Sequence, residues 1–428
     1  MIFAVLTIAV LGYILVIFES PLKINKTITA ILTGSLCWVS FALLHNGEQS
    51  VLSEKLSLHF GEIAGLLIFL LGAMTIVELI DLHKGFSVIT HRIRTKSVLK
   101  LLWIVGGVTF FMSALLDNLA TAIIMITLLK KLMPKGEVRM TLAGIVVIAA
   151  NAGGAFSPIG DVTTTLLWIG GQVSALGIVK VLFIPSIFVI LIPLIIASFR
   201  MRGFAALRVQ LSMAEVIQEE KMRGSLSVLL AGAFGLIMVP VIKSVTGLPP
   251  FIGVLIALGF VALVSLIYHR DKPQAVKDSY SVAHALTKVD ISSILYFMGI
   301  LLMVYALQDT GILGNFADYL LKNLPSIDMM IILIGVLSSI VDNGSLVAAS
   351  QAMFPLSQYP IDSSLWDLMA LCAGTGGSML IIGSAAGIAV MEKEKITFLW
   401  YLKKITPLAV AGYIAGIISF FVMYWLTH

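Results

Sequence analysis

Charged residues are scarce in this chain of 428 residues, and that scarcity decides the class of protein. Asp, Glu, Lys and Arg make up 12% of the residues, whereas hydrophobic residues make up 59%, and the mean hydropathy is +1.04. A soluble domain carries roughly 25% charged residues, so this composition excludes an ordinary soluble domain. It indicates a polytopic membrane protein.

Cysteine is nearly absent, and the first apolar segment lacks the basic residues that begin a signal peptide. Cys37 and Cys372 lie in separate apolar segments, so we expect buried thiols, and neither a disulfide nor a metal site is supported. The first positive charges, Lys23 and Lys26, follow the first apolar segment. That segment is therefore expected to span the membrane rather than to be a cleavable signal peptide.

Long apolar runs are what the chain does contain. A spanning helix needs about 20 mostly apolar residues. Two apolar stretches, 99–132 and 327–356, fold around a polar centre. The expected crossings are 1–18, 27–44, 62–80, 139–169 (interrupted), 174–199, 225–243, 250–268, 291–308, 364–391 (interrupted) and 405–426.

The net charge of +5 is explained by membrane topology. Suppose that the chain starts outside, crosses ten times, and folds each polar-centred stretch into a hairpin that returns to its own side. All but four of the 28 Lys and Arg residues then lie inside. The four outside are Lys55, Lys180, Lys243 and Lys322. This positive-inside bias predicts that both termini lie outside, and it argues against a nucleic-acid surface.

The two halves of the chain carry the same two motifs in the same order. "SALLDN" at 113–118 corresponds to "SSIVDN" at 338–343. "GGAFSPIGD" at 153–161 corresponds to "GGSMLIIGS" at 376–384, at nearly the same offset along the chain. Each half has five crossings, an odd number, so the second half is expected to be inverted. Inverted repeats with interrupted helices in matching positions are typical of secondary transporters.

The sequence therefore predicts an all-α polytopic membrane protein, built as an inverted-topology repeat of two five-crossing halves, each with a re-entrant hairpin and a broken helix. Broken backbone at membrane depth leaves N–H and C=O groups unpaired, which is costly unless protein, water or a ligand satisfies them. In 151–161, glycines permit the turn and Pro158 delays the next helix. The freed carbonyls can coordinate a cation, so we expect a binding loop there.

Three acidic residues, Asp117, Asp161 and Asp342, stand at breaks within apolar sequence, with no Lys or Arg close in sequence. A carboxylate inside a membrane costs at least about 2.5 kcal/mol, so each is a functional candidate. Amide and hydroxyl side chains surround them, and these oxygens suit a hard cation. They are Asn118, Asn151, Ser157, Thr163, Thr164 and Thr165 in one half, and Asn343, Ser345, Thr375, Ser378 and Ser384 in the other.

Structural roles are open for several of these residues. The hydroxyls can bond back to helix carbonyls, Asn151 and Asn343 can be caps, and Asp342 can cap a hairpin tip. Soft-metal ligands are missing, because no histidine is expected deep in a span and the two cysteines are unpaired. Four further acids near span ends are expected at the membrane interface: Glu62, Glu78, Asp309 and Asp367.

These motifs resemble those of NhaD-type sodium/proton antiporters, in the ion transporter superfamily that also holds sodium–dicarboxylate and arsenite carriers. The resemblance covers nearly the whole chain and is most specific in "SALLDNLATA" (113–122) and "NAGGAFSPIGDVTTTLLWIGG" (151–171). It implies exchange of sodium or lithium for protons, without a cofactor, in a prokaryotic inner membrane. Ser384 departs from the pattern because it stands where Asp161 stands in the first half, so the two half-sites should differ.

By this resemblance, cation and proton binding is assigned to residues at the two hairpin tips and the first break. They are Asp117, Asn118, Asn151, Asp161, Thr163, Thr164, Asp342 and Asn343, with sodium itself at Asp117, Asn118, Asp161 and Thr164. The secondary candidates are Ser157, Ser338, Thr375, Ser378 and Ser384.

The resemblance also implies a scaffold that dimerises and a transport unit that moves as a body, elevator-fashion. The first half would comprise scaffold helices at 1–98 and a hairpin, broken helix and final helix for transport at 99–199. A cytoplasmic amphipathic linker would follow at 200–224. The second half would repeat the scaffold at 225–326 and the transport elements at 327–428.

Other functions remain open at this point. A sodium-coupled dicarboxylate symporter resembles this architecture, but its hairpin tips carry Ser-Asn-Thr, whereas Asp-Asn here would repel a second carboxylate unless a cation intervened. An arsenite/proton carrier also has acidic and amide groups in its hairpin. An intramembrane aspartyl protease would need a Tyr-Asp pair and Gly-x-Gly-Asp, but Leu116 precedes Asp117 and Pro158 replaces the first glycine. A passive channel is disfavoured, because two inverted half-sites do not require a ring of subunits.

Overall fold

The computed structural model describes residues 2–17, 25–44, 49–90, 93, 95, 97–201 and 224–427. Over these ranges the regular secondary structure consists of α-helices, which confirms the predicted all-α fold class. Most of the linker predicted at 200–224 lies outside the described residues.

The helices of the first half are interrupted where predicted: within the hairpin 99–132, between α6 and α7, and within the broken span 139–169, between α8 and α9. Short polar side chains set several of their starts: the Ser97 hydroxyl accepts a hydrogen bond from the Lys100 N–H at α6, and the Ser174 hydroxyl accepts one from the Gly177 N–H at α10. The described helices are α1 (Ile2–Ile17), α3 (Lys26–Leu44), α4 (Gln49–Leu82), α5 (Ser87–Thr90), α6 (Val98–Ser113), α7 (Asn118–Leu132), α8 (Glu137–Ala155), α9 (Val162–Ile169) and α10 (Ala175–Arg200).

The second half has the same order of long, paired and broken helices, with short connecting helices added. Its described helices are α12 (Ser225–Thr246), α13 (Pro250–His269), α14 (Gln274–Ser279), α15 (Val282–Leu286), α16 (Ile291–Asp309), α17 (Ile312–Asn323), α18 (Ile327–Leu337), α19 (Asn343–Met353), α20 (Ser364–Gly376), α21 (Ala385–Glu394), α22 (Phe398–Lys404) and α23 (Thr406–Thr427).

Eight of the described helices are long and apolar enough to cross a membrane, fewer than the ten predicted crossings. The difference lies in α1, which has 16 residues, and in α20, which the second break ends after 13 residues. The span predicted at 62–80 lies within α4, which begins earlier, at Gln49. Polar residues in its first turns lower the hydropathy without ending the helix. His59 lies in the part of this helix that precedes the predicted span.

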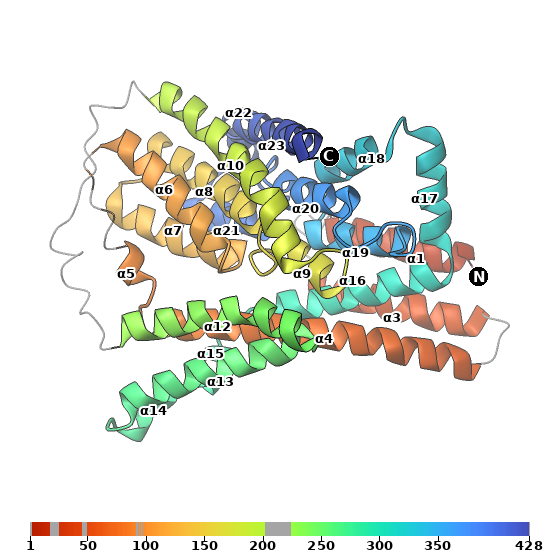
Figure 1. The fold of residues 1–428 in the computed structure, drawn as a ribbon, viewed down its shortest axis with the longest axis horizontal. Coiled ribbons are helices and arrows are strands. Elements are labelled where there is room, and N and C mark those ends of the chain that lie inside the picture. The colour runs from red at the N-terminus through yellow and green to blue at the C-terminus, as the bar shows by residue number, and fades with distance from the viewer. Residues whose placement is uncertain are drawn as a thin grey trace.

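The helices form two layers, as Figure 1 shows. One layer contains α3, α4, α12, α13 and α16, and the other contains α6 to α10 and α18 to α23. Within the first layer α3 packs on α16 and α4 on α13; within the second, α10 packs on α23 and α8 on α20. Contacts between the layers include those of α16 with α19.

Helix contacts, both within and between the halves, recur when each helix is replaced by its counterpart in the other half. The α6–α8 pair has its counterpart in α18–α20, the α3–α16 pair in α13–α4, and the α7–α21 pair in α19–α9. Both halves therefore use the same packing, and each contributes helices to both layers. The inverted orientation of the halves in a membrane stays a prediction.

Candidate functional site

Two helices are interrupted at the glycine-rich motifs. The first break separates α8 from α9 between Ala155 and Val162, and the second separates α20 from α21 between Gly376 and Ala385. A Cβ on Gly153 would collide with the Phe110 carbonyl oxygen, and one on Gly376 would collide with the Gly335 carbonyl oxygen. Glycine at these positions lets each hairpin arm lie directly against the broken helix.

Serine hydroxyls join the hairpins to the breaks in an equivalent way. Ser113 Oγ donates to the Ala150 carbonyl oxygen at 2.6 Å, and Ser338 Oγ donates to the Ala373 carbonyl oxygen at 3.0 Å. The two serines are aligned by the hairpin motifs, and the two alanines keep the offset of the glycine-rich motifs. Residues that the two motifs align in sequence therefore make the same hydrogen bond in each half of the protein.

Asp161 lies at the centre of the site. It is 3% exposed and immediately precedes α9, but its carboxylate does not cap that helix. Instead Asp161 Oδ1 accepts a hydrogen bond from Asn118 Nδ2 at 3.0 Å, and Oδ2 accepts one from Asn343 Nδ2 at 3.2 Å. One asparagine comes from each hairpin tip. Both tips therefore meet on a single buried carboxylate.

Asn151 extends this network into the second break. Its Oδ1 accepts from Asn118 Nδ2 at 3.0 Å, while its Nδ2 donates to Ser378 Oγ at 2.8 Å and to Ser384 Oγ at 3.1 Å. Asn151 is fully buried. The structure thus brings together predicted residues that lie in opposite halves of the sequence.

Asp117 and Asp342 begin the second arms of the two hairpins and cap them. Asp117 Oδ1 accepts hydrogen bonds from the Leu119 and Ala120 N–H groups at 2.6 and 2.9 Å. Asp342 Oδ2 accepts hydrogen bonds from the Ser345 N–H and hydroxyl, both at 3.1 Å. The capping role considered for Asp342 is therefore present, and Asp117 has it as well.

All three carboxylates line one cavity of about 100 Å³ between the two layers, together with Asn118 and Asn343. The opposite wall includes Lys26 of α3 and Tyr296 of α16, with Lys26 Nζ 5.2 Å from the centre of the Tyr296 ring. No Lys or Arg lies close in sequence to the three aspartates. Tertiary packing brings Lys26 to the same cavity, and no local pattern indicates this.

Most predicted hydroxyl groups bond to backbone carbonyls at the breaks. Thr164 Oγ1 donates to the carbonyl oxygens of Ser157 at 2.7 Å and Asp161 at 3.0 Å, and Ser157 Oγ donates to that of Ala114 at 2.5 Å. Thr375 Oγ1 donates to the Leu371 carbonyl oxygen at 2.6 Å. Thr164 and Ser157 thereby connect the first break to itself and to the hairpin tip, whereas Thr375 bonds back within α20.

Thr163 differs from the other hydroxyl residues. It is fully buried and its Oγ1 faces the Asp161 carboxylate without a well-aligned hydrogen bond to any described residue. Asp367, which was expected near the end of a span, lies in the first turn of α20 and is 3% exposed.

Comparisons with known proteins identify the chain's relatives. The family described as "Citrate transporter" matches residues 13–366. Sodium/proton antiporter 1 of Arabidopsis thaliana is 44% identical over 96% of this chain and 70% of its own length. The Na(+)/H(+) antiporter NhaD of Vibrio cholerae is 31% identical over 97% of this chain and 90% of its own length.

The fold also has a solved relative. The YdaH transporter of Alcanivorax borkumensis, whose crystal structure is described as having an unusual topology, superposes with a TM-score of 0.60. It is 11% identical, and the match covers 94% of this chain and 98% of that one. It supports a polytopic transporter fold. On the family match and its curated relatives, this chain belongs to the citrate-transporter family of membrane carriers and, within it, to the NhaD-type sodium/proton antiporters.

Proposed function

We propose that the protein exchanges sodium or lithium for protons across a membrane, and that cation and proton compete for the carboxylates around Asp161. The observation that carries this proposal is the environment of Asp161, a buried carboxylate held between one asparagine from each hairpin tip. Relatives whose names state sodium/proton antiport are 44% and 31% identical to this chain over 96% and 97% of its length, which supports the same exchange here.

The family description mentions citrate, but the cavity chemistry favours a cation. Asp117, Asp161 and Asp342 all line the cavity of about 100 Å³. A citrate or dicarboxylate anion would bring further negative charge to these three carboxylates, whereas Lys26 supplies a single positive charge. A small hard cation instead finds carboxylate, amide and hydroxyl oxygens, the ligands that such ions prefer.

Competition follows from the shared ligand. A proton on Asp161 or Asp117 removes the charge that binds sodium, and a bound sodium ion opposes protonation of the same carboxylates. The pair would then titrate as a unit. Asn118, which now donates to Asp161, can turn its amide oxygen toward a cation. Exchange results if the loaded carrier moves and the empty, fully ionised carrier does not.

The two layers provide a division for such movement. The layer of α3, α4, α12, α13 and α16 would be the scaffold and would form a homodimer, and the layer of hairpins and broken helices would carry the ion, elevator-fashion. The segments proposed are 1–98 and 225–326 for the scaffold and 99–199 and 327–428 for transport. The excess of basic residues in alternate loops supports termini on the outer side of a bacterial inner membrane.

Proton flux in everted vesicles tests the function. Respiration establishes a proton gradient, and NaCl, LiCl, KCl, arsenite, succinate and citrate are then added in turn. We expect sodium and lithium to release protons, and arsenite and the two carboxylates to have no effect. A response to succinate or citrate without a response to sodium would overturn the proposal.

A further inference from the structure

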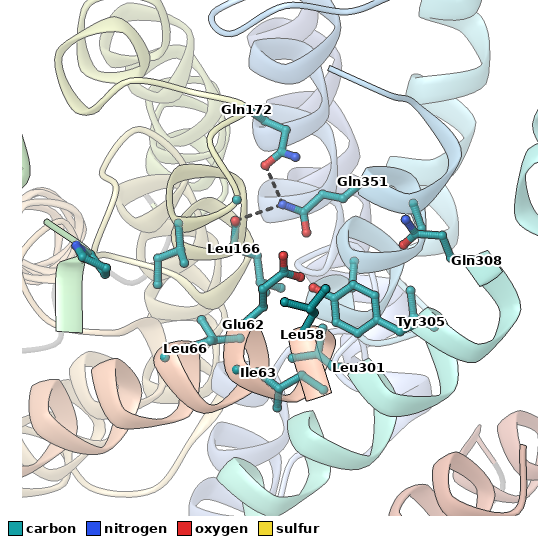
Figure 2. A pocket seen from close by; sticks show the side chains of 18 of the residues that line it. Leu58, Glu62, Ile63, Leu66, Leu166, Gln172, Leu301, Tyr305, Gln308 and Gln351 are labelled. Carbon is teal, nitrogen blue, oxygen red and sulfur yellow. Dashed lines mark hydrogen bonds between the residues drawn. The ribbon is translucent and has the colours of Figure 1, made fainter. Parts of the chain in front are cut away.

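A second and larger cavity, of about 710 Å³, opens between the same two layers (Figure 2). Its walls come from α4 and α16 on one side and from the ends of α9 and α19 on the other. It shares no lining residue with the cavity around Asp161. By the predicted topology it faces the outer side. We call it the vestibule.

Glu62 is the charged residue that lines the vestibule. Its side chain is 65% exposed, and its Oε2 lies 3.8 Å from His59 Nδ1, so the carboxylate is held near His59 while it stays open to water and to ions that enter with it. Figure 2 shows the Glu62 carboxylate, the Tyr305 hydroxyl and the Gln351 side-chain oxygen pointing toward one another. A carboxylate, a phenol and an amide oxygen form a ligand set for a hard cation.

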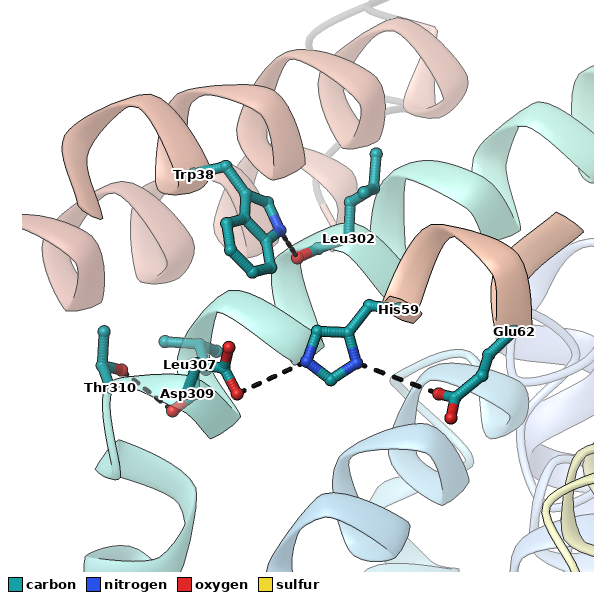
Figure 3. Close-up of polar contacts among 7 residues, drawn as sticks. All are labelled: Trp38, His59, Glu62, Leu302, Leu307, Asp309 and Thr310. Carbon is teal, nitrogen blue, oxygen red and sulfur yellow. Dashed lines mark hydrogen bonds and ion pairs between the residues drawn. The ribbon is translucent and has the colours of Figure 1, made fainter. Parts of the chain in front are cut away.

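The neutral oxygen groups are held in place by their neighbours. Gln351 Nε2 donates to the Leu166 carbonyl oxygen at 3.0 Å, which leaves the amide oxygen toward the vestibule. The Tyr305 ring stacks on His59, with 4.2 Å between ring centres and 17° between planes. His59 Nε2 in turn lies 3.4 Å from Asp309 Oδ1 (Figure 3). The hydroxyl and amide oxygens are thus preorganised, which lowers the cost of binding.

The oxygen groups belong to different layers. Glu62 and Tyr305 come from α4 and α16, whereas Gln351 comes from α19. The three oxygen groups therefore face one another only while the two layers keep their present relative position. If the layers slide past each other during transport, the set separates and a bound cation is released.

We propose that the vestibule is a second, weak binding site for the transported monovalent cation, with Glu62 as its charged ligand and Tyr305 and Gln351 as neutral oxygen ligands. This proposal rests on the proposed antiport. The site concentrates the cation on one side of the membrane without taking part in exchange for the proton.

The sidedness of the sodium dependence tests this site. Glu62→Gln should raise the apparent sodium constant by about two- to fivefold when sodium is added to the vestibule side, since an exposed charge contributes about 1 kcal/mol or less. With sodium on the opposite side the constant should not change. Right-side-out and everted vesicles give the two measurements, at low ionic strength because salt screens the charge. The maximal rate should persist, because Asp161 is intact.

Glu54→Gln is the matched control, since Glu54 is exposed on the same helix two turns earlier and does not line the vestibule. It should leave the constant unchanged on both sides. An equal change from Glu62→Gln and Glu54→Gln, an equal change on both sides, or no change at all would overturn the vestibule site.

A binding measurement separates this proposal from the antiport itself. Purified Asp161→Asn protein should retain weak binding of radioactive sodium, and the added Glu62→Gln substitution should weaken that binding by about two- to fivefold while the melting temperature stays the same. Loss of proton exchange in the wild type would refute the antiport but leave this binding result intact. Absence of weak sodium binding in Asp161→Asn protein would refute the vestibule site alone.

Discussion

The two broken segments have the same backbone packing but different chemistry. In both, a glycine allows a hairpin arm to approach, and a second glycine lies against the carbonyl that precedes the next helix: a Cβ on Gly154 or Gly377 would meet the Gly160 or Gly383 carbonyl oxygen at 2.8 Å. The next residue is Asp161 in one half and Ser384 in the other. Ser384 Oγ caps α21 by accepting from the Gly387 N–H at 3.1 Å, whereas the Asp161 carboxylate leaves its own helix uncapped.

The glycines of each break therefore build the fold, whereas the residue that follows them decides whether the break carries charge. Capping satisfies a helix start, and serine does it well. Asp161 forgoes that stabilisation and instead turns toward the asparagines of the two hairpin tips. A chain that places a charged group where a neutral cap suffices gives up stability for another purpose. We therefore infer that the first break carries the exchange chemistry and that the second supports it through Ser378 and Ser384.

The largest expected effect comes from removing the charge at the first break. Asp161→Asn keeps the size of the side chain but eliminates the carboxylate, so sodium-driven proton release should be abolished. Asp117→Asn should have the same result if the two carboxylates act as a pair. The measurement is proton release in everted vesicles at saturating sodium. Ser384→Ala is the control from the second break and should retain exchange. Full activity of Asp161→Asn would contradict the inference that the first break carries the exchange chemistry.

The pH dependence of the wild type should be the next largest effect. If sodium and a proton exclude each other from the same carboxylates, each competing proton raises the apparent sodium constant by about tenfold per pH unit on the acid side. The constant should therefore fall as pH rises and then level off once the carboxylates are ionised without sodium. Proteoliposomes at several pH values provide the measurement. A constant that does not vary with pH, while transport stays coupled, would mean that the proton travels through other groups.

Asn118→Ala should have a smaller effect, because it removes a neutral ligand and a hydrogen bond but leaves the charge of Asp161. A hydrogen bond to a charged group contributes about 1.5–3 kcal/mol, which corresponds to an increase of about tenfold or more in the apparent sodium constant. Activity should persist at high sodium. The readout is the sodium dependence of proton release, and loss of exchange at saturating sodium in a normally folded protein would assign Asn118 a role in coupling.

Thr164→Ala should have the smallest effect on transport. The Thr164 hydroxyl donates to the Ser157 and Asp161 carbonyl oxygens, so its loss should lower the melting temperature and raise the apparent sodium constant only a few-fold. Thr163→Val should raise the apparent sodium constant more than Thr164→Ala does. The reason is that the Thr163 hydroxyl lies beside Asp161 without a well-aligned hydrogen bond within the described chain. A greater change in sodium constant from Thr164→Ala than from Thr163→Val would reverse these assignments.

The sequence by itself determined the class of protein, the positions of both breaks and the polar residues beside them. Scarce charge and long apolar runs are properties of composition, and glycine at a break is a local steric requirement, so both are readable without a fold. α4 extends beyond the predicted span 62–80 because hydropathy detects the apolar run and not the start of the helix. The nearly constant offset between the motifs corresponds to equivalent contacts of Ser113 and Ser338.

Tertiary structure alone decided which groups face one another. The meeting of Asn118 and Asn343 on one carboxylate requires the two halves to pack together, because the two hairpin tips come from opposite halves of the chain. The approach of Lys26 to the aspartates, and of Gln351 to Glu62, likewise depends on contacts between layers. Local sequence patterns determine how a segment folds, but they contain no distance between segments, and the electrostatics of a buried site depends on those distances.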